Sequence, residues 1–312
     1  MSMLECFFSN KYAGRGDLFD GLKVWNDEKY RQLQGTYPVI FLSFAGVKAG
    51  NIKDLKAAVK IVIANLYAMF KDIMKSDIFD ENDRESFFAV NERMEDVKAQ
   101  MAITSLCIYL ERYYGKEVIV LLDEYDTPMQ EAWLGGCWDE AVGFFRSFFD
   151  NTFKANPHLY RGVITGITRI SKESIFSDLN NLDVVTTTSD EYADSFGFTE
   201  DEVFRVLDDV GLGSEKGNVK YWYDGFTFGK YTDIYNPWSI TSFIKKGGKY
   251  SAYWANTSSN GLVNSLIQTG KAELKEIIRV LIEGGSFKAM IDEQIVFDQL
   301  GYSANAVWSL LL

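Results

Sequence analysis

The chain has 312 residues, of which 47% are hydrophobic and 15% aromatic, a composition that excludes a disordered polypeptide. Its net charge of −12 and pI of about 4.7 argue against a general nucleic-acid-binding surface, because phosphate binding requires clustered Lys and Arg. No apolar run reaches the roughly 18 residues of a membrane span, and the N-terminal sequence MSMLECFFSN lacks the basic region and cleavage site of a signal peptide.

The cysteines and the histidine indicate neither disulfides nor a metal centre. Cys6, Cys107 and Cys137 are far apart and match no metal-binding spacing, so we expect thiols in a reducing cytoplasm. The single histidine, His158, lies in the turn-like sequence Ala-Asn-Pro-His, which is typical of a surface residue. Without a second histidine, a His-rich metal site or a Ser-His-Asp triad has little support.

The first third of the chain predicts helices around one strand. Residues 1–8 are apolar and have no N-cap, as at the end of a helix. Pro38–Phe44 is a short apolar run that predicts a strand, and the three- and four-residue spacing of apolar positions in Asn51–Met74 predicts an amphipathic helix. We expect a polar loop over Asp77–Asn91 and a second long helix over Arg93–Tyr113.

The sequence VIVLLDEYD contains the most informative residues of the chain. Its apolar run, Val118–Leu122, is typical of a parallel strand that is buried on both faces. Asp123, Glu124 and Asp126 follow at the carboxyl end of this strand, where open α/β sheets bind their ligands. An apolar strand that ends in Asp-Glu is also how P-loop ATPases present a Walker B site. The alternative is an acidic loop that merely follows a strand.

A third apolar strand is predicted at Tyr160–Ile167, after a helix at Trp138–Ala155. It ends in Thr168 and Arg169, and a polar residue or an arginine at such a position can sense a γ-phosphate or stabilise charge on it. The alternative for Arg169 is a salt bridge to one of the nearby carboxylates, which needs no nucleotide.

The remainder predicts a fourth strand and then a second lobe. Leu182–Thr188 is the strand candidate, Thr199–Glu202 is a capping box, and Asn236-Pro237 begins another helix. Tyr223–Phe226 (YDGF) is a hairpin signal. We place the lobe boundary near Ser195, which gives an α/β core over residues 1–195 and a mostly helical lobe with a hairpin over 196–312.

Several stretches together resemble the bacterial AAA-ATPase-like family, a P-loop ATPase domain often followed by a PD-(D/E)XK nuclease-like domain. In the family's order, the matching stretches are MSMLECFF, YPVIFLSF, VIVLLDEYDTP, GVITGITRISKESIFSDLNNL, FGFTEDEV, YDGFTFG and IYNPWSI. The resemblance implies a P-loop NTPase-type parallel sheet with helices on both faces, and binding of ATP and Mg²⁺.

The resemblance also implies roles for individual residues. Asp123 would position Mg²⁺, and Asp123 and Asp126 would contact the cofactor. Glu124 would orient the attacking water, and Thr168 and Arg169 would sense the phosphate.

The chain departs from the family in the phosphate loop. The family carries a glycine-rich loop ending in Gly-Lys-Thr before the MSML segment, and the motif G-x-x-x-x-G-K-[ST] occurs nowhere in these 312 residues. We therefore expect a fragment without the first strand, the P-loop and the nuclease-like part, and without activity as given. The alternative is a non-catalytic interaction or scaffold module on the same fold.

The family's topology predicts the order of the strands. Val39–Phe44 would be the second strand, Val118–Leu122 the third, Gly162–Ile167 the fourth and Asp183–Thr187 the fifth. We expect Val118–Leu122 to lie between the second and fourth strands, all parallel.

Overall fold

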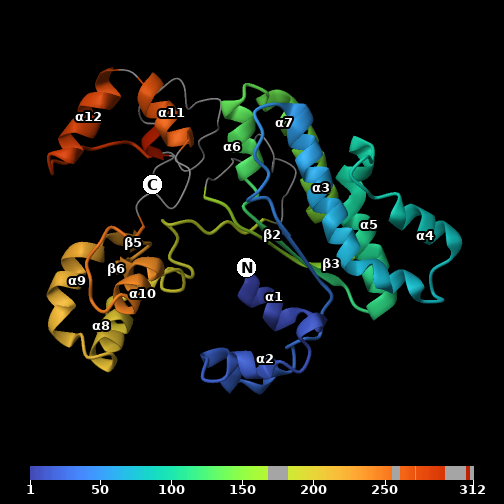
Figure 1. Cartoon of the computed structure of the whole chain (residues 1–312), viewed down its shortest axis with the longest axis horizontal. Helices are drawn as coiled ribbons and strands as arrows, with labels where there is room; N and C mark the ends of the chain where they lie inside the picture. The colour runs from blue at the N-terminus through green and yellow to red at the C-terminus, as the bar shows by residue number, and fades with distance from the viewer. Residues whose placement is uncertain (168–181, 255–260, 271, 292–306, 310–312) are drawn as a thin grey trace. The chain divides into compact units, whose positions relative to one another are not determined.

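The computed structural model describes residues 1–167, 182–254, 261–270, 272–291 and 307–309 (Figure 1). The chain divides into two compact units. Unit 1 comprises Met1–Asn180 and Leu262–Leu311, and unit 2 comprises Asn181–Gly261 with Leu312.

Unit 1 contains a three-stranded parallel sheet. Strands β1 (Val39–Ser43), β2 (Val118–Asp123) and β3 (Leu159–Ile164) are arranged in the order β1-β2-β3. Val39 lies opposite Ile119, and Leu122 lies opposite Ile164. The predicted parallel arrangement, with the Val118–Leu122 strand in the centre, is therefore confirmed. Within the described part of the chain β3 is an edge strand, and Tyr160 in it is 43% exposed.

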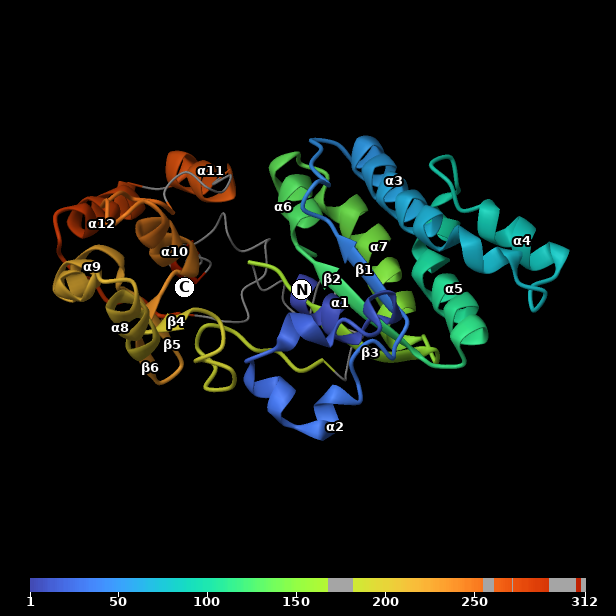
Figure 2. The same cartoon turned by 60° about the horizontal axis from the view of Figure 1, so that its bottom comes forward.

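Helices cover both faces of this sheet (Figures 1 and 2). On one face, Phe44 after β1 packs against Phe145 and Phe148 of α7 (Trp138–Phe149), with ring centroids 6.0 and 5.8 Å apart. On the other face, α1 (Ser2–Phe8) covers a buried cluster. The members of this cluster come from β1, from β2 and from the chain two residues before β1: Tyr37, Val39, Ile119 and Leu121. The alternation of side chains along each strand supplies apolar residues to both faces.

Two 19-residue helices of unit 1 pack against each other: α3 (Ile52–Phe70) and α5 (Asp96–Tyr114). Both were predicted, with ends that differ by a few residues. They are joined by a buried hydrogen bond in which the Tyr67 hydroxyl donates to the carbonyl of Ala102 at 2.6 Å. They are joined also by Asp96, whose carboxylate pairs with Lys60 at 2.7 Å and Lys56 at 3.0 Å.

Two predictions from the sequence are wrong in this architecture. Residues 77–91 are not a loop throughout, because they contain helix α4 (Glu81–Phe88), which begins with a capping box between Asp80 and Asp83. Leu182–Thr188 is not a strand, since residues 182–186 have no regular structure and a turn follows. There the Ser189 hydroxyl accepts from the backbone of Thr186 at 3.0 Å, and such local side-chain bonds compete with strand pairing.

The described part of unit 2 combines a small antiparallel sheet with three α-helices. Strands β4 (Phe198–Thr199), β5 (Phe226–Phe228) and β6 (Tyr231–Tyr235) form the order β4-β6-β5. The helices are α8 (Glu200–Asp209), which begins with the predicted Thr199–Glu202 capping box, α9 (Lys216–Tyr223) and α10 (Pro237–Lys245), which the Asn236 side chain caps.

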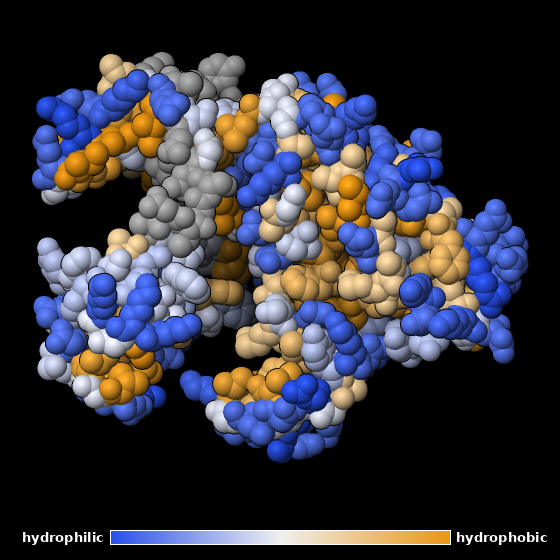
Figure 3. All heavy atoms as spheres, viewed as in Figure 1, coloured by the Kyte–Doolittle hydropathy of each residue, from blue (hydrophilic) through white to orange (hydrophobic). Residues whose placement is uncertain are grey.

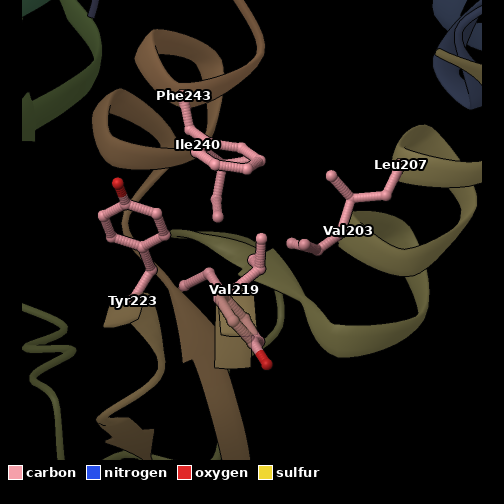
Figure 4. Packing of buried hydrophobic residues seen from close by; sticks show 7 residues of the cluster. Val203, Leu207, Val219, Tyr223, Ile240 and Phe243 are labelled. Carbon is pink, nitrogen blue, oxygen red and sulfur yellow. The ribbon is translucent and has the colours of Figure 1, made fainter. Parts of the chain in front are cut away.

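The core of unit 2 gathers one face of each helix around β6. Figure 4 shows Val203 and Leu207 of α8 facing side chains of α9 and α10. The buried residues of this hydrophobic cluster are Val203, Leu207, Val219, Tyr223, Tyr235, Ile240 and Phe243.

The hairpin of unit 2 turns at a different place from the predicted one. Phe228 pairs with Tyr231, so the connection is Gly229-Lys230, and Gly229 has a φ of 50°. The YDGF signal is instead the end of α9, whose C-cap is Asp224.

Two further helices of the described chain are α11 (Gly261–Thr269) and α12 (Ala272–Ile282). Figure 3 shows hydrophilic atoms along one side of α12 and hydrophobic atoms along the other. Leu274 in it is buried, whereas Ile282 is 81% exposed. In the part of the chain that the structure describes, no helix has the length and apolar character needed to cross a membrane. Unit 1 also contains the short α-helices α2 (Glu28–Arg31) and α6 (Thr127–Leu134).

Candidate active site

Asp123 lies at the carboxyl end of the central strand, as predicted. It is the last residue of β2, it is half-buried, and Ser43 of β1 lies opposite it. On the other side, the hydroxyl of Thr165 donates to Asp123 Oδ1 at 2.5 Å. The backbone continues the ladder beyond β3, since Thr165 N donates to the carbonyl of Leu122 at 2.9 Å. The carboxylate is therefore held between the ends of two neighbouring parallel strands.

Glu124 has a backbone conformation that non-glycine residues rarely adopt. Its φ is 54°, in the left-handed region, and its side chain is exposed. The hydroxyl of Thr127 donates to Glu124 Oε2 at 2.9 Å, which fixes the carboxylate over the start of α6. Such strained residues persist where the surroundings determine them strongly, and they cluster at functional sites.

Asp126 is the buried member of the acidic sequence, at 1% exposure. Gln130 Nε2 donates to its Oδ2 at 2.9 Å, and its carbonyl accepts from Gln130 N at 2.9 Å. A Cβ placed on Gly166 would lie 2.5 Å from Asp126 Oδ1 and 2.6 Å from Tyr125 Cε1. The chain after β3 therefore passes so close to Asp126 that only glycine fits there.

The two predicted phosphate sensors, Thr168 and Arg169, lie outside the described residues. The residue that the structure brings to Asp123 is Thr165, which the sequence reasoning missed. The strand predicted from the sequence continues to Ile167, whereas β3 ends at Ile164. Continuing the register one step beyond the Leu122–Ile164 pair places Thr165 beside Asp123.

The acidic residues do not form a metal site made of protein ligands alone. Among the described residues, no group of three His, Cys, Asp or Glu side chains is placed to hold a metal ion. Mg²⁺ bound to a nucleotide needs only one or two carboxylates, because waters and phosphates supply the other ligands. Asp123 fits that requirement as a single carboxylate, kept in place by a neutral donor.

Comparison with known proteins defines the family. The profile described as "Predicted AAA-ATPase" (AAA-ATPase-like) matches residues 1–176, more than half of the chain, and this range contains the whole parallel sheet and the acidic sequence. The chain belongs to this AAA-ATPase-like family.

A curated relative is an uncharacterized protein in the vnfD 5' region of Azotobacter chroococcum mcd 1. It is 24% identical over 296 residues, which cover 93% of this chain and 52% of the relative. The chain thus spans about half the length of that relative. No solved structure matches the chain.

Proposed function

We propose that the acidic end of β2 is the Walker-B-like part of an ATP site, in a protein of P-loop NTPase type. The observation that supports this most directly is the hydrogen bond between Asp123 and Thr165 at the ends of adjacent parallel strands. Ligands of open α/β sheets bind beyond the carboxyl ends of the strands. Family membership makes ATP with Mg²⁺ the ligand to test first.

Each side chain has a separate role in this proposal. Asp123 would help to hold Mg²⁺ of the bound nucleotide, and the Thr165 hydroxyl keeps the Asp123 carboxylate oriented. Glu124, which is exposed and fixed by Thr127, orients the attacking water. Bound ATP with Mg²⁺ would supply the phosphoryl group and the neutralising charge that its transfer requires.

Three further residues complete the proposed site. Asp126 is a positioning residue, because its carboxylate is buried and bonds to Gln130. Thr168 and Arg169 follow Thr165 closely in the sequence, and we propose them as the groups that sense the γ-phosphate.

Paramagnetic broadening tests this site even at low affinity. We expect ATP with Mn²⁺ to broaden the backbone amide resonances of Asp123, Glu124 and Thr165, and excess Mg²⁺ to reverse the effect. Asp123→Asn should abolish the broadening. Asp77→Asn, which makes the same chemical change at an exposed position, should retain it.

The outcome separates the two functions that the family and the sequence allow. Broadening confined to other parts of the protein, or absent at millimolar ATP, would overturn the nucleotide site. A non-catalytic interaction module would then be the better description of this polypeptide.

A further inference from the structure

Unit 2 contains an open cavity of about 320 Å³, and five of its ten lining residues are aromatic. Its rings come from Trp222 and Tyr223 at the end of α9, Phe226 of β5, and Tyr253 and Trp254 after α10. All these residues belong to unit 2, so the cavity is a property of that unit alone. The volume suits a small organic group.

The aromatic wall is held in place by ring contacts and hydrogen bonds. Trp222 stacks on Tyr250, with centroids 5.5 Å apart, and Tyr250 donates its hydroxyl to Glu215 at 2.7 Å. Tyr223 lies nearly parallel to Tyr253 and donates to the carbonyl of Ser251 at 3.1 Å.

Large apolar surface nevertheless remains open at this fixed wall. Trp222 is 49% exposed and Trp254 is 53% exposed. Rigid aromatic side chains with this much exposed surface are typical of binding sites.

A carboxylate stands among these rings. Asp224 lines the cavity, and its side chain is 19% exposed. It follows Tyr223 directly and precedes Gly225, whose φ of 155° is one that residues with a side chain rarely adopt.

The positive charge near Asp224 is shared with two other carboxylates. Lys220 Nζ lies 2.6 Å from Glu200 and 2.9 Å from Asp233, but 4.0 Å from Asp224. Burial, and then the neighbouring Asp233, raise the pKa of Asp224. Of the three carboxylates, Asp224 lies farthest from the Lys220 ammonium group. A second cation would therefore be most favourable beside Asp224.

Aromatic faces with a carboxylate select one chemical class of ligand. A cation is attracted both to the rings and to the carboxylate, whereas an anion is repelled by Asp224 and a hydrocarbon would desolvate it without compensation. One ring of the wall already accepts a cation, since Lys246 Nζ lies 4.5 Å from the centroid of Tyr253.

We propose that the aromatic cavity of unit 2 binds an organic ammonium ion, with its alkyl groups against Trp222 and Trp254 and its charge toward Asp224. The ammonium group can belong to a free small molecule or to an alkylated lysine of a protein. The two sources share the same chemistry at the cavity.

Choline and its neutral isostere 3,3-dimethylbutan-1-ol test the proposal on the whole chain. Both have the same shape, and only choline is charged. We expect choline to change the tryptophan fluorescence in a saturable way, and the alcohol to bind at least about tenfold more weakly, in line with a partly desolvated cation–π and ion-pair contact. Equal affinities, or no saturable change with choline, would overturn the proposal.

Variants locate the binding. Asp224→Asn should reduce choline affinity about tenfold, to the level of the alcohol, because it removes the charge but keeps the shape. Trp222→Ala should weaken both ligands, and since this residue is half exposed the variant provides a test even if Asp224→Asn fails to fold. Trp238→Phe, an exposed tryptophan that does not line the cavity, should leave choline affinity unchanged. Unchanged affinity in both cavity variants would contradict the site.

A peptide that carries trimethyllysine distinguishes the two sources. Tighter binding of the peptide than of choline, with the same dependence on Asp224, would assign the ammonium group to a protein partner. Tighter binding of choline would assign it to a small molecule. Both results support the cavity as a cation site, and neither depends on nucleotide binding in unit 1.

Discussion

The hydroxyl of Thr165 donates a hydrogen bond to the carboxylate of Asp123, and this contact joins the ends of β2 and β3. The two residues are 42 positions apart in the sequence. They meet because the parallel register of the two strands continues one residue beyond β3. The orientation of the Asp123 carboxylate therefore depends on Thr165, which belongs to no sequence motif that we recognised.

Thr165→Val should measure the strength of this contact. The substitution keeps the shape and removes the donor, so we expect the free energy of unfolding to fall by about 1–2 kcal/mol, as for hydrogen bonds to a charged group at a partly buried site. Urea denaturation checks this. Thr227→Val, at an exposed strand position, is the control, and an equal loss in both variants would show that the Asp123 contact adds nothing.

Gly166→Ala should be strongly destabilising. Its new methyl group would lie 2.5 Å from Asp126 Oδ1 and 2.6 Å from the ring of Tyr125, so we expect a loss of about 2–3 kcal/mol by overpacking. The matched control is Gly143→Ala in α7, where a Cβ meets nothing within 4 Å and helix propensity should give a gain of about 0.5–1 kcal/mol. Thermal unfolding of the two variants should show shifts of opposite sign.

The ATP affinity of the 312-residue polypeptide should be low. Its sequence contains no G-x-x-x-x-G-K-[ST] loop, and that loop supplies most contacts to the phosphates. We expect binding at least ~100-fold weaker than in a family member that carries the loop, which is a difference of about 2.7 kcal/mol. Calorimetry with ATP and Mg²⁺ tests this, and micromolar affinity with turnover would contradict it.

Asp96 should make stability depend on pH in the acid range. Lys60, and also Lys56, lower the pKa of its carboxyl in the folded protein. The folded-state pKa is therefore below the unfolded value of about 3.9, so the stabilisation is complete at higher pH and is lost as the pH falls through the lower folded value.

The size of the Asp96 contribution can be measured with one substitution. The carboxylate is 40% exposed, so Asp96→Asn should cost only about 0.5–1 kcal/mol at pH 7. The difference from the unsubstituted protein should shrink as the pH falls below about 4. Urea denaturation at several pH values gives the comparison, with Asp77→Asn as the exposed control. A difference that grows toward acid pH would refute the assignment.

Cys107 should be unreactive in the folded protein. It is buried, and burial raises the pKa of its thiol to about 12, while Cys6 and Cys137 are partly exposed. With Ellman's reagent at pH 8 we expect two thiols to react in the native state and the third only in denaturant, because the thiolate is the reactive form. Cys107→Ala should leave the native count unchanged and lower the denatured count by one.

The sequence predicts the centre of the sheet well because burial there leaves little freedom. Val118–Leu122 is buried along its whole length. An unbroken apolar run of this kind predicts a parallel strand that helices cover on both faces. The end of β3 was harder to predict, since this strand is exposed over Tyr160–Gly162 and its apolar pattern does not report burial. The contact of Thr165 with Asp123 follows from the register between β2 and β3. The sequence pattern of one strand does not reveal how that strand is aligned with its neighbour.

Competing local signals account for the other errors. Tyr223–Phe226 has the composition of a hairpin turn, but Tyr223 is drawn into the core of unit 2 as the last residue of α9. Asp80 caps a helix in a segment whose polar composition suggested a loop. In the first case packing against the rest of unit 2 decided the structure, and in the second a capping box within the segment did.

The parallel sheet of unit 1 also determines the order in which this unit can fold. Val39 pairs with Ile119 and Leu122 pairs with Ile164, so the central strand acquires both neighbours only after long stretches of chain have closed into loops. Helices α3 and α5 are built from contacts within a few residues and can form before any strand pairs. We therefore expect the acidic end of β2 to assemble late in folding, and a chain folded only in its helices would display an unpaired, fully apolar Val118–Leu122 segment to other chains.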